Sequence, residues 1–291
     1  MTPPAPEGTQ SRRAYRAAQA QAPTRTPRAG RNLPAAIGVG GFLITLVLVS
    51  LLFYPLAFVL LATCAAAVGL WELDQAFRQG RISPPLPPLL VSAGLVPVAY
   101  FWGGEGLAVG FAAAVGLVLL WRSVGPSEGA AQDVAGGVFA VAYVPLLVAT
   151  TSLMLAAPDG VGRIITFILV TVASDTGGYA VGVLAGRTPM APSLSPKKSW
   201  EGFAGSVGGS ALVGAICVPL LLDGPWWGGV ILGALVAAFA TVGDLAESSI
   251  KRDLGIKDMS SLLPGHGGIM DRLDSLVVTA PVCWVLFGIL V

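Results

Sequence analysis

From Pro34 onward the chain is a series of long apolar runs separated by short polar segments. Most of these runs are long enough to cross a hydrocarbon core of about 30 Å as a helix. Glycines, prolines and clusters of charge mark their boundaries. The pattern predicts nine membrane-spanning helices, near residues 34–54, 55–73, 87–102, 104–121, 133–157, 161–185, 202–222, 226–250 and 270–290.

Composition supports this interpretation, because 54% of the residues are hydrophobic and only 11% are charged. Soluble domains carry about 25% charged residues. We therefore expect an all-α polytopic integral membrane protein. All three cysteines lie within apolar runs, which argues against a disulfide framework or a cysteine-based metal site.

Residues 1–33 differ in kind, because they are rich in proline, alanine and arginine and lack an apolar face that could pack. This composition predicts a disordered, basic, cytoplasmic arm. After it we expect N-terminal transmembrane helices over residues 34–157 and a C-terminal transmembrane catalytic region over residues 158–291.

The distribution of positive charge predicts the orientation in the membrane. If the N-terminus lies inside the cell, nine helices place only Arg163 of the 17 lysines and arginines on the outer side. Cytoplasmic segments of membrane proteins are enriched in these two residue types. We therefore expect an N-in, C-out protein of the cell (inner) membrane.

Three polar stretches then meet at the cytoplasmic face. The first, SDTGGYAVGVLAGR from Ser174, places Asp175 within the predicted helix 161–185. An ionisable group inside a membrane is costly unless it faces a cavity or a partner, so Asp175 is a candidate for substrate binding. The alternative is a cap of a helix that breaks near Gly177 and Gly178.

The second stretch is APSLSPKKSWEG, which begins at Ala191. Pro192 opposes helix formation, while Ser195, Lys197 and Lys198 offer donors to an anion just outside the bilayer. Alternatively, the two lysines only orient the protein in the membrane.

The third stretch is GDLAESSIKRDLGIKDMSSLLPGHGGIMDRLDS, residues 243–275. Asp244 and Lys251 lie seven residues apart and share one helical face, and Asp271 and Asp274 share a face of the last helix. Hard cations such as Mg²⁺ prefer oxygen ligands at sites that handle phosphates. We therefore expect Asp244, Asp271 and Asp274 to act in catalysis and to bind metal.

The same stretch carries positive charge and glycines. Lys251 and Arg272 are candidate catalytic residues, and Arg252 a substrate-binding residue, because their charges would stabilise a polyphosphate. Gly267 and Gly268 would allow the backbone to approach it closely.

Ser248 and His266 complete the candidate substrate-binding residues. Ser248 lies on the same helical face as Asp244. His266 is the only histidine, and it fits a general acid or base, a metal ligand or a hydrogen-bonding brace of the loop. Interfacial ion pairs, such as Asp271 with Lys251, are the structural alternative for these charges.

A family resemblance rests on these residues. The run S-x-I-K-R-x4-K-D-x-S-x2-L-P-x-H-G-G-I-x-D-R-L-D, which ends at Asp274, resembles the signature of phosphatidate cytidylyltransferases, also called CDP-diacylglycerol synthases. The first two stretches resemble segments of that family in the same order. The specific likeness spans residues 170–275, whereas residues 1–160 match only in being hydrophobic.

The resemblance implies that phosphatidate and CTP react to give CDP-diacylglycerol and pyrophosphate, with Mg²⁺ required and a second cation left open. Membrane lipids are the other expected partners. We expect no nucleic-acid partner, and the sequence does not decide whether the protein forms a homodimer. An ion-coupled transporter fits less well because it would carry acids in both halves of the chain. A transferase that uses a CDP-alcohol donor would carry D-x3-D, not the D-x2-D of Asp271 and Asp274. A non-enzymatic scaffold would not need acidic and basic clusters that meet.

Overall fold

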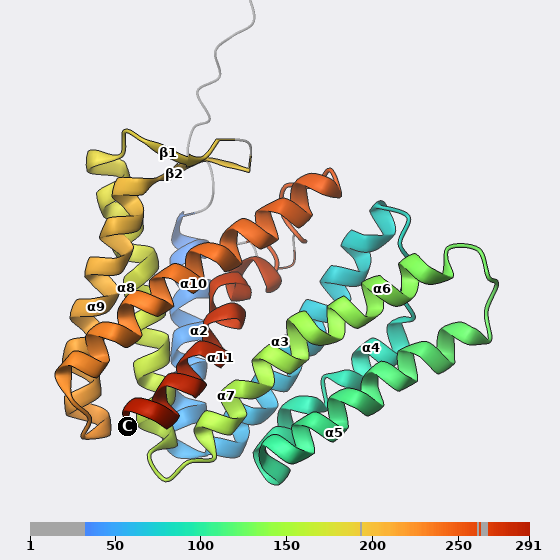
Figure 1. Cartoon of the computed structure of the whole chain (residues 1–291), viewed down its shortest axis with the longest axis horizontal. Helices are drawn as coiled ribbons and strands as arrows, with labels where there is room; N and C mark the ends of the chain where they lie inside the picture. Colours follow the sequence, from blue (N-terminus) through green and yellow to red (C-terminus); the bar gives the residue numbers. More distant parts are fainter. Residues whose placement is uncertain (1–32, 193, 261, 263–266) are drawn as a thin grey trace, which may run out of the picture.

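A computed structural model describes residues 33–192, 194–260, 262 and 267–291. Within these residues the protein is mainly a bundle of helices (Figure 1). This agrees with the expected all-α membrane class. The predicted disordered arm, except for Leu33, lies outside the described residues.

The N-terminal part begins with α2 (Leu33–Phe53) and α3 (Pro55–Gln79). Pro55 is tolerated at the start of α3 because the first N–H groups of a helix have no partner within it. The next elements are α4 (Leu86–Ser92) and α5 (Leu95–Ser123). Gly103 divides α5 into two helical stretches, because its φ of 64° and ψ of −158° are not helical. The sequence placed a boundary between two spans at the same glycine.

The predicted helix 133–157 is present as one run of three elements. These are α6 (Ala130–Val141), a π-helical turn η1 (Ala142–Leu146) and α7 (Leu147–Leu155). Pro145 lies within η1 and has no N–H to donate to a regular α-helical bond. The wider turn occurs where that bond is lost.

The C-terminal part contains α8 (Gly160–Ala185), α9 (Trp200–Leu222), α10 (Trp226–Asp253) and α11 (Met270–Leu290). Counted over the described residues, seven helices are long and apolar enough to cross a membrane, and Gly40–Phe53 is a shorter apolar helix. The polytopic membrane class is therefore confirmed. Nine spans and the N-in, C-out orientation stay predictions.

A small hairpin departs from the all-α prediction. Strands β1 (Pro189–Ala191) and β2 (Ser195–Ser199) pair antiparallel at one end of the bundle, between α8 and α9 (Figure 1). Glu201 anchors the hairpin. Its carboxylate accepts the N–H groups of Arg187 and Thr188, both at 3.1 Å, and the Thr188 hydroxyl at 2.8 Å.

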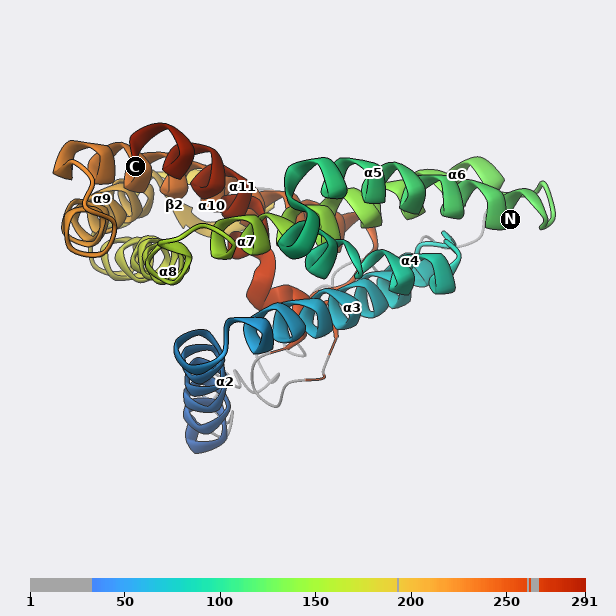
Figure 2. The ribbon, with the colours of Figure 1, turned by 90° about the horizontal axis from the view of Figure 1, so that it is seen from below.

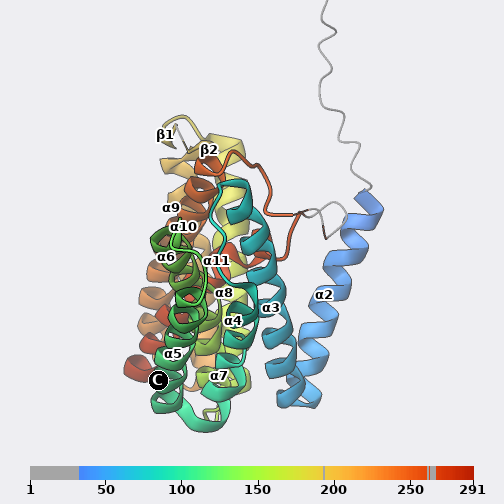
Figure 3. The ribbon, with the colours of Figure 1, turned by 90° about the vertical axis from the view of Figure 1, so that its right-hand side faces the viewer.

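The C-terminal helices α8 to α11 pack closely against their neighbours. A Cβ atom at Gly177 of α8 would lie 2.5 Å from the carbonyl oxygen of Gly205 in α9, and one at Gly243 of α10 would lie 2.8 Å from that of Asp274 in α11. Small residues allow helix backbones to approach in a membrane. By contrast, α2 packs mainly on α3 and stands apart from the other helices (Figures 2 and 3).

Candidate active site

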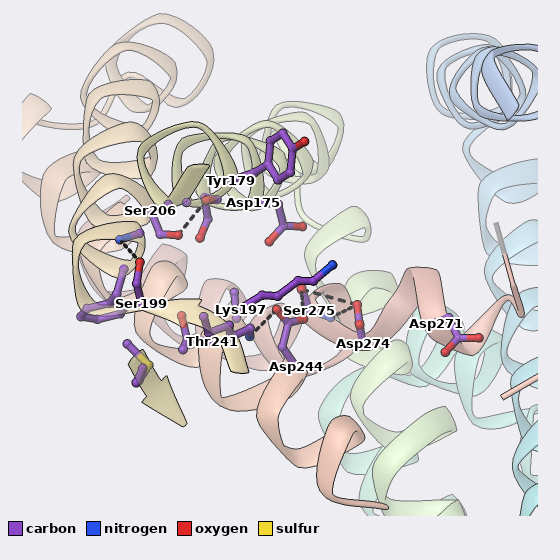
Figure 4. Close-up of a pocket in the computed structure, with 18 of the residues that line it drawn as sticks. Asp175, Tyr179, Lys197, Ser199, Ser206, Thr241, Asp244, Asp271, Asp274 and Ser275 are labelled. Atoms are coloured by element: carbon purple, nitrogen blue, oxygen red, sulfur yellow. Dashed lines mark hydrogen bonds and ion pairs between the residues drawn. The ribbon is translucent and has the colours of Figure 1, made fainter. Parts of the chain in front are cut away.

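A cavity of about 390 Å³ lies between α8, the hairpin, α9, α10 and the start of α11 (Figure 4). All three polar stretches of the sequence reach it. The predicted site residues that line it are Asp175, Lys197, Lys198, Asp244, Asp271, Arg272 and Asp274.

Asp244 links the hairpin to α10 and α11. Its Oδ2 lies 2.5 Å from Nζ of Lys198, and its Oδ1 accepts a 2.8 Å hydrogen bond from the Ser275 hydroxyl. Ser275 also donates its backbone N–H to Oδ1 of Asp274 at 2.7 Å. The side chains of Lys198 and Asp244 are 26% and 27% exposed, so their ion pair is accessible from the cavity.

Asp175 occupies the opposite wall of the cavity. It projects from α8 toward α10 and α11, and the Lys197 side chain extends into the space between Asp175 and Asp274 (Figure 4). Asp175 is exposed although it belongs to a helix long enough to span the membrane. This agrees with an ionisable group that faces a polar cavity, not with the predicted alternative of a helix break, because α8 continues to Ala185.

Asp271 is buried and already has three donors. Its Oδ1 lies 2.8 Å from Nζ of Lys251, and its Oδ2 accepts the N–H groups of Met259 at 2.9 Å and Gly268 at 2.8 Å. Lys251 also lies 3.3 Å from Oε1 of Glu247, which is buried in α10. The ion pair between Asp271 and Lys251, considered as an alternative from the sequence, is present.

The three predicted metal ligands differ in the acceptor capacity that remains. A carboxylate offers about four lone-pair positions. Asp271 uses three of them, Asp244 uses two, and Asp274 accepts one short hydrogen bond from Ser275. Within the described residues, no group of three or more His, Cys, Asp or Glu side chains is arranged to hold a metal ion. Binding of Mg²⁺ therefore stays a prediction.

Several other predicted residues do not line the cavity as far as the structure describes the chain. They are Lys251, which pairs with Asp271 behind the cavity wall, and Ser195, Ser248, Arg252, Gly267 and Gly268. The two glycines shape the turn before α11, where Gly267 has a φ of 81° and Gly268 donates its N–H to Asp271. Their contact with substrate stays a prediction, and His266 lies outside the described residues.

Sequence reasoning missed Glu72 of α3. Its buried carboxylate accepts hydrogen bonds from Ser260 and from the backbone N–H groups of Ile269 and Met270, at the entrance to α11. The sequence does contain a signal for Glu72, because an acidic residue near the end of an apolar segment is a candidate for a functional or structural role. Its partners are not visible there, because they lie almost 200 residues away along the chain.

Comparisons of the sequence with known proteins give matches over nearly the whole chain. A model of the cytidylyltransferase family matches residues 35–290. The phosphatidate cytidylyltransferase of Mycobacterium leprae is 38% identical over 290 residues, which cover 94% of this chain and 93% of that protein. The enzyme of the same name from Mycobacterium bovis is 37% identical over 297 residues, which cover 97% of each chain.

A more distant relative shows a shorter match. The phosphatidate cytidylyltransferase of Synechocystis is 45% identical over 128 residues, which cover 41% of this chain and 43% of that protein. The family match and the mycobacterial relatives extend through the N-terminal helices, where the motifs had indicated only shared hydrophobicity. The chain therefore belongs to the cytidylyltransferase family.

Proposed function

We propose that this protein is a phosphatidate cytidylyltransferase, which converts phosphatidate and CTP into CDP-diacylglycerol and pyrophosphate. The observation that carries the proposal is the cavity, in which carboxylates of α8, α10 and α11 face two lysines of the hairpin, within a membrane bundle. The names of the relatives that match nearly the whole chain support the same activity.

The lysines and the arginine of the cavity are suited to hold phosphates. Lys197, Lys198 and Arg272 present cationic donors, and charge-assisted hydrogen bonds to phosphate are strong. An incoming polyphosphate competes with Asp244 for Lys198. Because the exchange replaces one anionic partner of Lys198 by another, it frees an oxygen of Asp244 while the lysine stays paired.

The chemical step is an in-line displacement at phosphorus. A phosphate oxygen of phosphatidate attacks the α-phosphorus of CTP, a new P–O bond forms, and the bond to pyrophosphate breaks. Arg272 and Lys197 stabilise the negative charge that develops on the leaving group.

Asp244, Asp271 and Asp274 would hold Mg²⁺. The donor chemistry fits, because carboxylate oxygens are the ligands that this cation prefers, and Asp244 and Asp274 retain the most acceptor capacity. When bound, the ion neutralises phosphate charge and acts as a Lewis acid. Asp271, whose contacts with Lys251, Met259 and Gly268 leave about one acceptor position, would bind the ion through that position.

The surroundings of α11 suit a substrate with a charged head and apolar chains. Asp274 and Ser275 line the polar cavity, whereas Leu273, Leu276 and Val277 line a separate apolar pocket of about 140 Å³ on another face of the helix. Phosphatidate has the matching chemistry, since its phosphate is anionic and its acyl chains are apolar.

The site faces the cytoplasm in this proposal, and the chain crosses the inner membrane nine times with its N-terminus inside. The positive charge of the hairpin and of the end of α10 supports this orientation. The break at Gly103 supports two crossings where α5 is otherwise continuous. CTP is a cytosolic polyanion, so it reaches a site on this side directly.

The decisive experiment is an activity assay of the purified protein in detergent. Phosphatidate and labelled CTP are incubated with the protein in the presence of Mg²⁺ or of a chelator, and labelled CDP-diacylglycerol is measured. We expect product only when both substrates and the cation are present. Diacylglycerol, which lacks the phosphate, serves as the matched control lipid. Absence of product, or equal transfer to diacylglycerol, would contradict the proposal.

A further inference from the structure

Glu72 connects the N-terminal part of the bundle to the helix that carries much of the site. It lies near the end of α3, and its side chain is fully buried. Its Oε1 accepts a hydrogen bond from the Ser260 hydroxyl at 2.5 Å and another from the Ile269 N–H at 3.0 Å. Its Oε2 accepts the Met270 N–H at 2.7 Å.

These backbone donors lie at the start of α11. The first N–H groups of a helix have no partner within the helix, and the partial positive charge there favours a carboxylate. Such caps normally come from the residue beside the helix. In this protein the acceptor belongs to a different helix, so the position of α11 is tied to α3.

Gly268 makes room for this contact. A Cβ atom at Gly268 would lie 2.7 Å from Oε2 of Glu72, so a larger residue would displace the carboxylate. Asp271 holds the same segment through the N–H groups of Gly268 and Met259. Two buried carboxylates therefore fix the turn that leads into α11.

We propose that Glu72 is a positioning residue for the transfer reaction. It holds the first turn of α11 so that Arg272 and Asp274 keep their places opposite Asp175 in the cavity. The inference rests on the proposed function of that cavity. Glu72 acts through α11, because it does not line the cavity itself.

A positioning role and a purely stabilising role differ in what they do to the folded enzyme. If Glu72 only stabilises the bundle, its loss lowers the thermal midpoint and leaves kcat unchanged well below that midpoint. If Glu72 positions α11, kcat falls even in fully folded protein. A displacement of about 1 Å in catalytic groups can slow a reaction on the order of 100-fold.

The test is Glu72→Gln in the full-length chain, assayed in detergent far below its thermal midpoint. Glutamine has the same size, but its NH2 group cannot accept a hydrogen bond, so at least one N–H of Ile269 or Met270 loses its partner. We expect kcat to fall by about 10- to 100-fold. The KM for CTP should change less than kcat, because the hairpin lysines do not contact Glu72 and still hold the phosphates when Arg272 shifts.

Asp74→Asn is the matched control. Asp74 lies two residues after Glu72 in the same helix and is also fully buried. Its carboxylate pairs with Arg78 at 2.8 Å. We expect this variant to keep the wild-type kcat at the same temperature, even if its thermal midpoint falls. Equal loss of kcat in both variants, or wild-type kcat in Glu72→Gln, would overturn the inference.

Glu72→Asp provides a second variant if Glu72→Gln does not fold. It keeps the negative charge, but its carboxylate is one methylene group further from α11. We expect folded protein with a reduced kcat and a smaller change in the KM for CTP, and a wild-type kcat would again refute the positioning role. If the wild-type chain forms no CDP-diacylglycerol, the proposed function fails instead, so the two failures are distinguishable.

Discussion

Asp271 and Asp274 are three residues apart, yet replacing each by asparagine should have different consequences. Asp271 accepts three donors, including the Lys251 ammonium group. Asp274 accepts chiefly the N–H of Ser275 and faces the cavity. Asp271→Asn therefore removes a structural ion pair as well as a site carboxylate, whereas Asp274→Asn removes only the site carboxylate.

The expected loss of folding free energy in each variant follows from the contacts that the variant removes. Breaking a buried ion pair costs about 3–5 kcal/mol. The side chains of Asp271 and Lys251 are 5% and 16% exposed, and Lys251 keeps Glu247 at 3.3 Å. An asparagine oxygen still accepts N–H bonds. We therefore expect Asp271→Asn to cost about 2–3 kcal/mol of folding free energy, and Asp274→Asn about 1 kcal/mol or less.

The assay combines thermal unfolding in detergent with the formation of CDP-diacylglycerol. Both variants should lose most of their turnover, because each lacks a carboxylate proposed to hold the cation that neutralises the phosphates. Only Asp271→Asn should also show a clear drop in thermal midpoint. Equal midpoint losses would refute the division of roles, and near-normal turnover of Asp274→Asn would refute its part in catalysis.

Three further predictions concern the membrane orientation and the hairpin. Cysteines that replace Asp159 and Arg252, in a chain otherwise free of cysteine, should react with impermeant reagents from opposite faces of the membrane; reaction from one face would refute nine spans. Lys197→Gln should raise the KM for CTP or lower kcat. Arg81 is also exposed but lies outside the cavity, so Arg81→Gln should change neither constant. Equal effects of the two substitutions would show that Lys197 only orients the protein. Glu201→Gln loosens the anchor of the hairpin and should raise the KM for CTP more than it lowers kcat; an unchanged KM would contradict this role.

The helices could be predicted from apolar runs, but their ends could not. The predicted helices 55–73 and 226–250 extend to Gln79 and Asp253 as α3 and α10. Hydropathy follows the segment that lies in hydrocarbon, whereas a helix continues as long as its backbone bonds and side-chain pairs support it. The pair between Asp74 and Arg78, four residues apart, supports such an extension of α3.

The site was only partly predictable for a related reason. Spacing along a helix shows which residues share a face, and it grouped Asp271 with Asp274. It does not show what lies opposite that face, and Asp271 meets Lys251 and two backbone N–H groups. The hairpin was also missed, because Pro192 was interpreted only as a break in helical structure and the contacts of Glu201 are tertiary.

Polar contacts between helices explain why the site can keep its shape in a membrane. Apolar surfaces gain little from leaving lipid, so close packing and hydrogen bonds must specify how helices meet. The hydroxyl groups of Ser206 and Ser210 donate to the carbonyl oxygens of Ser174 and Gly233, which joins α9 to α8 and to α10. Glu72 joins α11 to α3 in the same way. The geometry of the cavity therefore depends on buried groups such as Ser210 that do not line it. Replacing such a group should slow the transfer reaction, because the helices that carry the site residues shift.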